Sequence, residues 1–152
     1  MGISDGVTVD KIHGDVFIPA ILKCHDENLK FDNGWTVQVI GFNGIKKSKL
    51  FSGKCMKCQK QYWPSFEEIT LTENGTRIRK FYNVSDRNYF HLTARSVFEV
   101  KLLKQMTYSI FIGKTKFISF AKTYNLLHGS EIQHNRFIDA FYAYHVAKRI
   151  PG

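Results

Sequence analysis

The chain has 152 residues, is 43% hydrophobic and 14% aromatic, and carries a formal charge of +9. It is therefore long and apolar enough to fold around a core, and this composition excludes a disordered tail. Lys and Arg interrupt every apolar run before it reaches the length of a membrane span. The N-terminus lacks a basic segment followed by an apolar stretch, so we expect no secretory signal and an intracellular location.

The positive charge is concentrated in the second half of the chain. Residues 77–152 hold thirteen Lys and Arg against four acids, including all six arginines, whereas nine Lys and nine acids balance in residues 1–76. Such asymmetry is typical of a protein with one face that meets an anionic polymer. The alternative is a solvated surface that only keeps the protein soluble.

The first half predicts β-structure. The apolar run Val16–Ile18 favours a short strand before Pro19, and Phe31-Asp32-Asn33-Gly34 is typical of a turn. Four longer strands follow, the first two joined by the hairpin signal Asn43-Gly44. We predict them at Trp35–Phe42, Ile45–Phe51, Phe66–Thr72 and Arg77–Tyr82. These four strands predict one small antiparallel sheet with little core of its own, which a metal ion would stabilise.

From about Asn88 the apolar residues follow a helical period. Ser96-Val97-Phe98-Glu99 has the pattern of a capping box and predicts a helix start. The three helices are predicted at Ser96–Phe111, Thr115–Leu127 and Gln133–Arg149. The expected fold is therefore α+β: a zinc-ribbon-like antiparallel sheet over residues 1–87 and a three-helix region over residues 88–152. We expect the two to form one compact unit, which can be a piece of a longer protein.

The strongest chemical signal is the pair Cys55 and Cys58. Two cysteines separated by two residues can place both thiolates on one ion, because the turn between them points backbone amides at the sulfurs. Cys24 precedes the first strand of the hairpin and Cys55 follows the second, so the hairpin should bring them together. We expect one structural Zn²⁺ on these three thiolates, in a reducing compartment. The alternative is a pair of ordinary thiols in a turn.

The fourth ligand stays open from the residues alone. Glu27 lies at the C-x2-C spacing from Cys24, and His25 is adjacent to Cys24. Carboxylates are uncommon ligands of structural zinc, and neighbouring residues rarely converge on one ion. A water molecule or His91 are further candidates, and the site can also be degenerate.

A basic cluster accompanies the last predicted strand. Arg77 and Arg79 alternate along that strand and so share a face. With Tyr and Phe side chains interleaved, the cluster is the best candidate for phosphate contacts, and lysines of the second helix extend it. The candidates are Arg77, Arg79, Lys80, Arg87, Arg95, Lys114, Lys116 and Lys122. The alternative is a solvated strand edge that discourages pairing with another chain.

We expect no catalytic role within these residues. Acids are sparse in the second half, and neither a Gly-rich phosphate loop nor a Ser/His/Asp arrangement stands out. Cys58 as a nucleophile would need a base that the sequence does not indicate.

Several motifs resemble a known family. They are the Trp35 strand through Gly44, the Cys55/Cys58 pair with Tyr62, Arg79-Lys80-Phe81-Tyr82 and Ser119–Asn125. Together these resemble the CxC-type cysteine-cluster domain associated with Kyakuja–Dileera–Zisupton (KDZ) transposases, from about residue 15 to the end. The resemblance implies a zinc-binding module encoded with or beside a transposase that helps to recognise nucleic acid. Cys24, Cys55 and Cys58 match three of the family's paired cysteines, and Glu27 stands where the fourth is aligned.

The expected function is thus a non-catalytic, zinc-binding DNA-recognition module of mobile-element origin, located in the nucleus. DNA is favoured over RNA, and a transposase catalytic domain or subunit is a possible partner. We expect neither a membrane nor a small-molecule substrate as partner. The alternative is a structural or protein-interaction zinc module that binds no nucleic acid.

Overall fold

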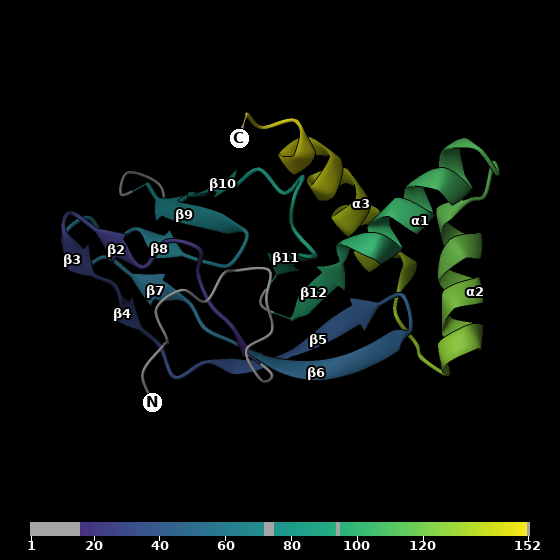
Figure 1. Cartoon of the computed structure of the whole chain (residues 1–152), viewed down its shortest axis with the longest axis horizontal. Helices are drawn as coiled ribbons and strands as arrows, with labels where there is room; N and C mark the ends of the chain where they lie inside the picture. Colours follow the sequence, from purple (N-terminus) through teal and green to yellow (C-terminus); the bar gives the residue numbers. More distant parts are fainter. Residues whose placement is uncertain (1–15, 72–74, 94, 152) are drawn as a thin grey trace.

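The computed structural model describes residues 16–71, 75–93 and 95–151 and confirms an α+β fold. Strands occupy the left and centre of Figure 1, and the three helices lie on the right. The short strands are β1 (Val16–Phe17), β2 (Lys23–Cys24), β3 (Glu27–Asn28), β4 (Lys30–Phe31), β7 (Gly53–Lys54) and β8 (Gln61–Tyr62). The longer strands are β5 (Trp35–Gly41), β6 (Gly44–Leu50), β9 (Phe66–Thr70), β10 (Arg77–Phe81), β11 (Tyr89–Thr93) and β12 (Ser96–Glu99).

The first sheet has the strand order β1-β6-β5-β12-β11. Strands β5 and β6 form the predicted hairpin, paired from Trp35 with Leu50 to Gly41 with Gly44. The loop residues are Phe42 and Asn43, one position earlier than the Asn-Gly signal suggests. The Glu99 carboxylate stabilises this hairpin tip, because it accepts a hydrogen bond of 2.8 Å from the Phe42 amide.

The second sheet has the order β10-β9-β8-β7-β4 and lies at the left of Figure 1. Strand β4 precedes β5 and strand β7 follows β6, and β4 and β7 pair with each other, with Lys30 opposite Lys54. The two segments that form the β5–β6 hairpin in the first sheet therefore pair again in the second sheet. Strand β10 forms the exposed edge. A two-stranded sheet of β2 and β3 completes this end of the molecule.

The prediction of one sheet made from the four longer strands is wrong. Strands β5 and β6 belong to the first sheet, whereas β9 and β10 belong to the second. The two pairs share the main core through Ile40, Ile45 and Phe81 but differ in their other apolar neighbours. Val37, Val39 and Leu50 pack with Phe17, whereas Phe66 stacks on aromatic rings beside the second sheet.

The predicted start of the first helix is also wrong. Ser96–Glu99 form strand β12, which pairs in parallel with β5, and helix α1 spans Val100–Phe111. The Ser96 hydroxyl accepts a hydrogen bond from Arg136 instead of capping a helix. Burial of Ser96, Val97 and Phe98 in the sheet outweighs the local capping pattern. Consequently the first sheet includes residues on both sides of residue 88.

Helices α2 (Phe117–His128) and α3 (His134–Lys148) agree with the prediction to within two residues at each end. Gly129 ends α2 as expected, with a left-handed φ of 62° that favours glycine. The described residues include no helix long and apolar enough to cross a membrane.

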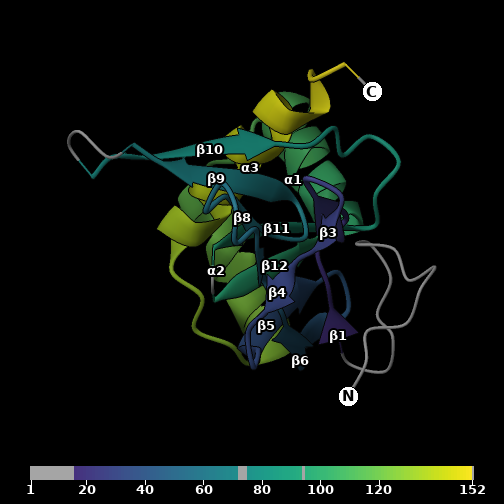
Figure 2. The ribbon, with the colours of Figure 1, turned by 90° about the vertical axis from the view of Figure 1, so that its left-hand side faces the viewer.

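The main core lies between the helices and the first sheet. Phe98 of β12 packs edge-on against Phe137 of α3, and Phe120 and Tyr124 of α2 contact the same ring. The Tyr124 hydroxyl donates a hydrogen bond of 2.7 Å to the Gly41 carbonyl oxygen, which attaches α2 to the end of β5. Figure 2 looks along the molecule from the end opposite the helices and shows β5 and β6 below β9 and β10.

Candidate metal centre

A tight turn between β2 and β3 carries the first two donor atoms. His25 and Asp26 occupy the two central positions, with φ of 54° and 60°. Positive φ at both positions is the mark of a type I′ turn, which matches the twist of a two-residue hairpin. The left-handed conformation costs free energy in a residue with a Cβ atom. Here it directs the imidazole of His25 back beside the thiol of Cys24, with Sγ and Nδ1 separated by 3.1 Å.

The second pair of donors lies in the turn between β7 and β8. The Gln59 amide donates to the Cys55 carbonyl oxygen at 2.8 Å, and the Cys55 amide donates to the Lys60 carbonyl oxygen at 3.0 Å. Inside this closed turn the amides of Cys58 and Lys57 donate to the Cys55 sulfur. Such amides stabilise a thiolate, as the C-x2-C spacing predicts.

The two turns bring four ligand atoms together. Cys24, His25, Cys55 and Cys58 each offer one atom, and these atoms all lie within 4.8 Å of one another. The Cys24 and Cys58 sulfurs are 3.7 Å apart, and the Cys55 sulfur is 3.4 Å from Nδ1 of His25. All three cysteines are free thiols. The arrangement can therefore hold a metal ion.

A small apolar base supports these four residues. Leu29, Tyr62 and Cys55 are buried together, and the Tyr62 hydroxyl donates a hydrogen bond of 3.2 Å to the Cys24 sulfur. Gly53 allows strand β7 to approach this base, since a Cβ atom there would lie 2.9 Å from Cδ1 of Leu29. These contacts fix the position of the β2–β3 turn relative to the β7–β8 turn.

The charges around the cluster favour a thiolate at Cys55. The amide of Cys58, with further hydrogen bonds from His25 and Lys57, lowers the pKa of the Cys55 thiol to about 6 despite its burial. At Cys24 the Tyr62 hydroxyl lowers the pKa, but burial and the two neighbouring thiols outweigh it and raise the pKa above its ordinary value. One thiol is therefore already charged near neutral pH, and a bound cation would favour ionisation of the others.

Among the candidates for the fourth ligand, His25 is the one that joins the three cysteines. The Glu27 carboxylate lies 3.4 Å from the Lys57 ammonium on the surface. His91 is buried elsewhere, beside the stacked rings of Phe66 and Trp63. Burial lowers the pKa of the His91 imidazole to about 3.

The basic candidates fall into separate groups. Arg77, Arg79 and Lys80 lie on the edge strand β10, where all three are exposed. Lys114, Lys116 and Lys122 lie around the start of α2 or on its outer face. Figure 1 shows β10 in the left half of the molecule and α2 at its right end, so the structure does not unite these two groups into one patch.

The candidate arginines differ in their surroundings. Arg77 and Arg79 share a face, as predicted, since both lie beside the carboxylate of Glu68, at 3.8 and 3.1 Å. Arg79 also donates to the Leu92 carbonyl oxygen and covers the Phe66 ring. Arg87 donates to the Pro64 carbonyl oxygen. Arg95 is exposed in the turn before β12.

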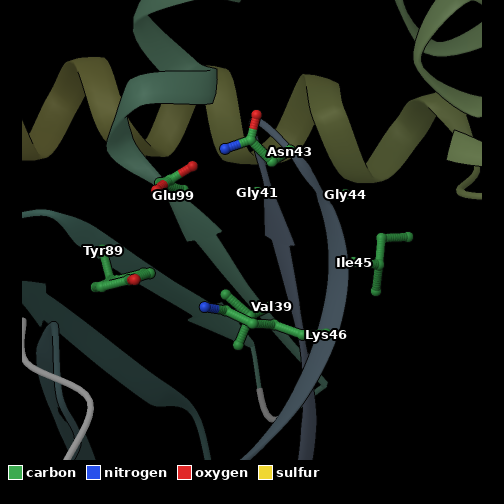
Figure 3. A pocket seen from close by; sticks show the side chains of 8 residues that line it. All are labelled: Val39, Gly41, Asn43, Gly44, Ile45, Lys46, Tyr89 and Glu99. Carbon is green, nitrogen blue, oxygen red and sulfur yellow. The ribbon is translucent and has the colours of Figure 1, made fainter. Parts of the chain in front are cut away.

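A separate hollow of about 180 Å³ lies at the tip of the β5–β6 hairpin. Figure 3 shows Tyr89 and Glu99 on one side of it and Ile45 on the other. The Glu99 carboxylate accepts the hydrogen bond of the Phe42 amide, so this acid already serves the hairpin. The hollow offers no donor set comparable to the cysteine cluster.

Comparison with known proteins identifies a match to one protein family. The sequence profile described as "CxC5 like cysteine cluster associated with KDZ transposases" matches residues 15–128. No curated protein and no solved structure matches the chain. The profile covers well over half of the chain and includes all four residues of the cluster. The chain therefore belongs to the CxC5-like cysteine-cluster family associated with KDZ transposases.

Proposed function

We propose that the chain is a non-catalytic module in which one Zn²⁺ fixes a surface that binds nucleic acid for a transposase. The main support for zinc binding is the spacing of the four ligand atoms. A zinc tetrahedron with Zn–S bonds of about 2.3 Å separates two sulfurs by about 3.8 Å. The Cys24 and Cys58 sulfurs are 3.7 Å apart, and three thiolates with one imidazole are a common structural zinc set.

Zinc would be held by the sulfurs of Cys24, Cys55 and Cys58 and by Nδ1 of His25. All four positions of the tetrahedron would then be filled by protein atoms, as in structural sites rather than catalytic ones. The ion would join two turns that lie thirty residues apart in sequence (from His25 to Cys55). Its role would be to hold the short strands β2, β3, β7 and β8, which have little apolar base of their own.

Metal content tests this part directly. Purified protein should contain one equivalent of zinc, and a Cys55→Ser/Cys58→Ser variant should contain none. A Glu27→Gln variant is the matched control and should keep its zinc, because Glu27 pairs with Lys57 outside the cluster. Equal metal content in the wild type and the double-serine variant would refute the zinc site.

The nucleic-acid part is supported by charge and by the family's association with transposases. Residues 77–152 carry the whole positive excess, and the exposed edge strand presents Arg77 and Lys80 to solvent. Neutralising phosphates releases counterions, so affinity should fall steeply as salt rises. A nuclear location and DNA as the preferred partner follow from this proposal.

The binding test compares two double variants. Arg77→Ala/Lys80→Ala removes two exposed charges of β10 and should weaken DNA binding at low salt and reduce the salt dependence by about two ions. Lys47→Ala/Lys49→Ala removes two exposed charges of β6 and serves as the control. Absence of binding to duplex or single-stranded DNA and RNA at low salt would refute the proposal.

A second candidate function is docking of a protein partner, and the helical end favours it. Large apolar side chains of all three helices are exposed there, among them Phe111 of α1, Leu126 and Leu127 of α2 and Tyr142 of α3. Exposed apolar surface rimmed by charge is typical of an interaction site. Six lysines but only two acids lie in residues 100–151, which suits an acidic amphipathic helix, for example of a transposase subunit. Leu126→Ser/Leu127→Ser should abolish such docking and leave zinc content unchanged.

A further inference from the structure

A hollow of about 370 Å³ lies beside the cysteine cluster, between the open end of the β5–β6 hairpin and the second sheet. Its lining includes both tryptophans of the chain, Trp35 and Trp63, together with Gln59, Gln61, Lys54 and Arg77. Strands β7, β8 and β9, which line it together with the start of β5, lie in the left half of Figure 1. Both indoles pack on one side against the apolar cluster of Phe17, Val37 and Leu50, and each remains partly exposed.

The two indoles form a rigid aromatic wall. Their ring centroids are 5.3 Å apart in an edge-to-face arrangement. Behind them Phe66 stacks on Trp63 at 5.7 Å, so the wall is supported from the core. Both tryptophans remain partly exposed. A partly exposed flat ring that cannot move aside is a platform for stacking another planar ring.

The acids of the hollow are already satisfied by the protein. Asp32 accepts hydrogen bonds from the Ser52 hydroxyl at 2.6 Å and from the amides of Ser52 and Gly34. Glu68 is paired with Arg79 at 3.1 Å. An amine ligand would therefore find no carboxylate ready to receive it, and the hollow is not a site for a cationic group.

The cations of the hollow are better placed to meet a ligand. The Arg77 side chain is 71% exposed and lies 3.8 Å from Glu68, a weak pairing. Lys54 has no ion pair or hydrogen bond from its ammonium within the described part of the chain. The combination of an aromatic wall, side-chain amides and two cations matches a planar base attached to phosphate.

We propose that this hollow receives one unpaired nucleobase of a nucleic-acid strand. Because the two rings are inclined by 69°, the base stacks on the face of one indole and meets the edge of the other, and the flanking phosphates bind Lys54 and Arg77. The inference rests on the proposed nucleic-acid function and deepens it, because it assigns a specific site and an unpaired substrate. The cysteine cluster adjoins the hollow, since Lys54 immediately precedes Cys55 and Gln59 immediately follows Cys58.

Intrinsic fluorescence tests the proposal without a label on the protein. The chain contains two tryptophans and both line the hollow, so a stacked base should quench the emission directly. We would titrate the zinc-loaded protein with a short oligothymidine strand, an abasic strand of equal length and a blunt duplex. The oligothymidine should quench saturably, and the abasic strand and duplex should not. Fluorescence anisotropy of labelled strands reports total binding in parallel.

Variants then assign the contacts. Trp35→Leu should weaken oligothymidine binding about tenfold, whereas Trp35→Phe, which keeps a stacking ring, should change it little. Lys54→Ala and Arg77→Ala should each weaken binding several-fold, and Lys47→Ala on β6 should not. Circular dichroism and zinc content confirm that each variant is folded. If Trp35→Leu does not fold, the Lys54→Ala and Arg77→Ala variants still test the site, and unchanged oligothymidine binding by both would refute it.

The possible failures are distinguishable. Single-strand binding by anisotropy without quenching overturns the base site and leaves the proposed function standing. Equal quenching by the abasic strand or the duplex overturns the claim that the ligand is an unpaired base. Quenching by thymidine monophosphate without binding of any strand supports the hollow but refutes the proposed function. No quenching and no binding at low salt refutes both.

Discussion

The Arg79→Ala variant gives the sharpest test of how the second sheet is held. Arg79 is a candidate phosphate contact by sequence, yet its guanidinium already has three partners in the protein. Nε lies 3.1 Å from the Glu68 carboxylate, a terminal nitrogen donates to the Leu92 carbonyl oxygen at 2.8 Å, and the guanidinium lies 4.7 Å from the centre of the Phe66 ring. Replacement by alanine removes all three contacts.

The expected loss of stability follows from the burial of Glu68. Its side chain is 8% exposed, so without Arg79 the carboxylate keeps Arg77, at 3.8 Å, as its one ion-pair partner among the described residues. A hydrogen bond to a charged group contributes about 1.5–3 kcal/mol. Because the Arg79 side chain is itself 41% exposed, solvent screening reduces this gain, and we expect a loss of about 2 kcal/mol. For a chain of this size the melting temperature should fall by about 4–8 °C.

Urea unfolding followed by circular dichroism measures this loss, with Arg77→Ala as the matched control. Arg77 lies on the same face and beside the same carboxylate but is 71% exposed, so its removal should cost less than about 0.5 kcal/mol. Glu68→Gln combined with Arg79→Ala should cost less than the sum of the single variants, because each single variant leaves an unpaired group. Equal stability of the Arg79→Ala and Arg77→Ala variants would refute the reasoning.

Three further changes test other parts of the structure. Gly53→Ala places a methyl group 2.9 Å from Cδ1 of Leu29 and should destabilise the protein by about 1–3 kcal/mol and weaken zinc binding; unchanged stability and metal affinity in unfolding and chelator-competition experiments would contradict this. Tyr124→Phe removes the 2.7 Å hydrogen bond to the Gly41 carbonyl oxygen and should cost about 1–2 kcal/mol in urea unfolding, without loss of zinc. His91 has its pKa lowered to about 3 by burial, below the value of about 6.5 expected in the unfolded chain, so the unfolded state takes up a proton first as the pH falls. Stability due to neutral His91 is thus present above pH 6.5 and is lost towards pH 3; His91→Phe should make the acid-side slope shallower by up to about 1.4 kcal/mol per pH unit, and an unchanged slope would contradict this.

Local signals in the sequence predicted much of the architecture. The Asn-Gly signal identified the β5–β6 hairpin, and the apolar period of the second half located α2 and α3 to within two residues. The proximity of Cys24 to Cys55 and Cys58 followed from the hairpin between them, and the structure confirms it. Each of these features depends on residues that are close in sequence or joined by one hairpin.

The errors concern features that depend on distant residues. The Ser96-x-x-Glu99 pattern satisfies a local rule for helix starts, but pairing with β5, nearly sixty residues earlier, makes it a strand. The separation of β5–β6 from β9–β10 into two sheets likewise depends on where β11 and β12 insert. No local signal reports such pairings.

The role of His25 was hidden for a different reason. Adjacent side chains in an extended strand point to opposite sides, which argues against two neighbouring ligands. The left-handed turn at His25 and Asp26 removes this objection, and its only sequence signal is an Asp in a two-residue loop between short strands.

The path of the chain has a mechanical consequence. The polypeptide passes between the two large sheets four times: from β1 through β2 and β3 to β4, from β4 to β5, from β6 to β7 and from β10 to β11. A hinge needs few covalent crossings, and four crossings resist bending of one sheet against the other. Cleavage of a single peptide bond would not release the cysteine-bearing end from the helical end, and a change in one sheet should be transmitted to the other as a rigid displacement.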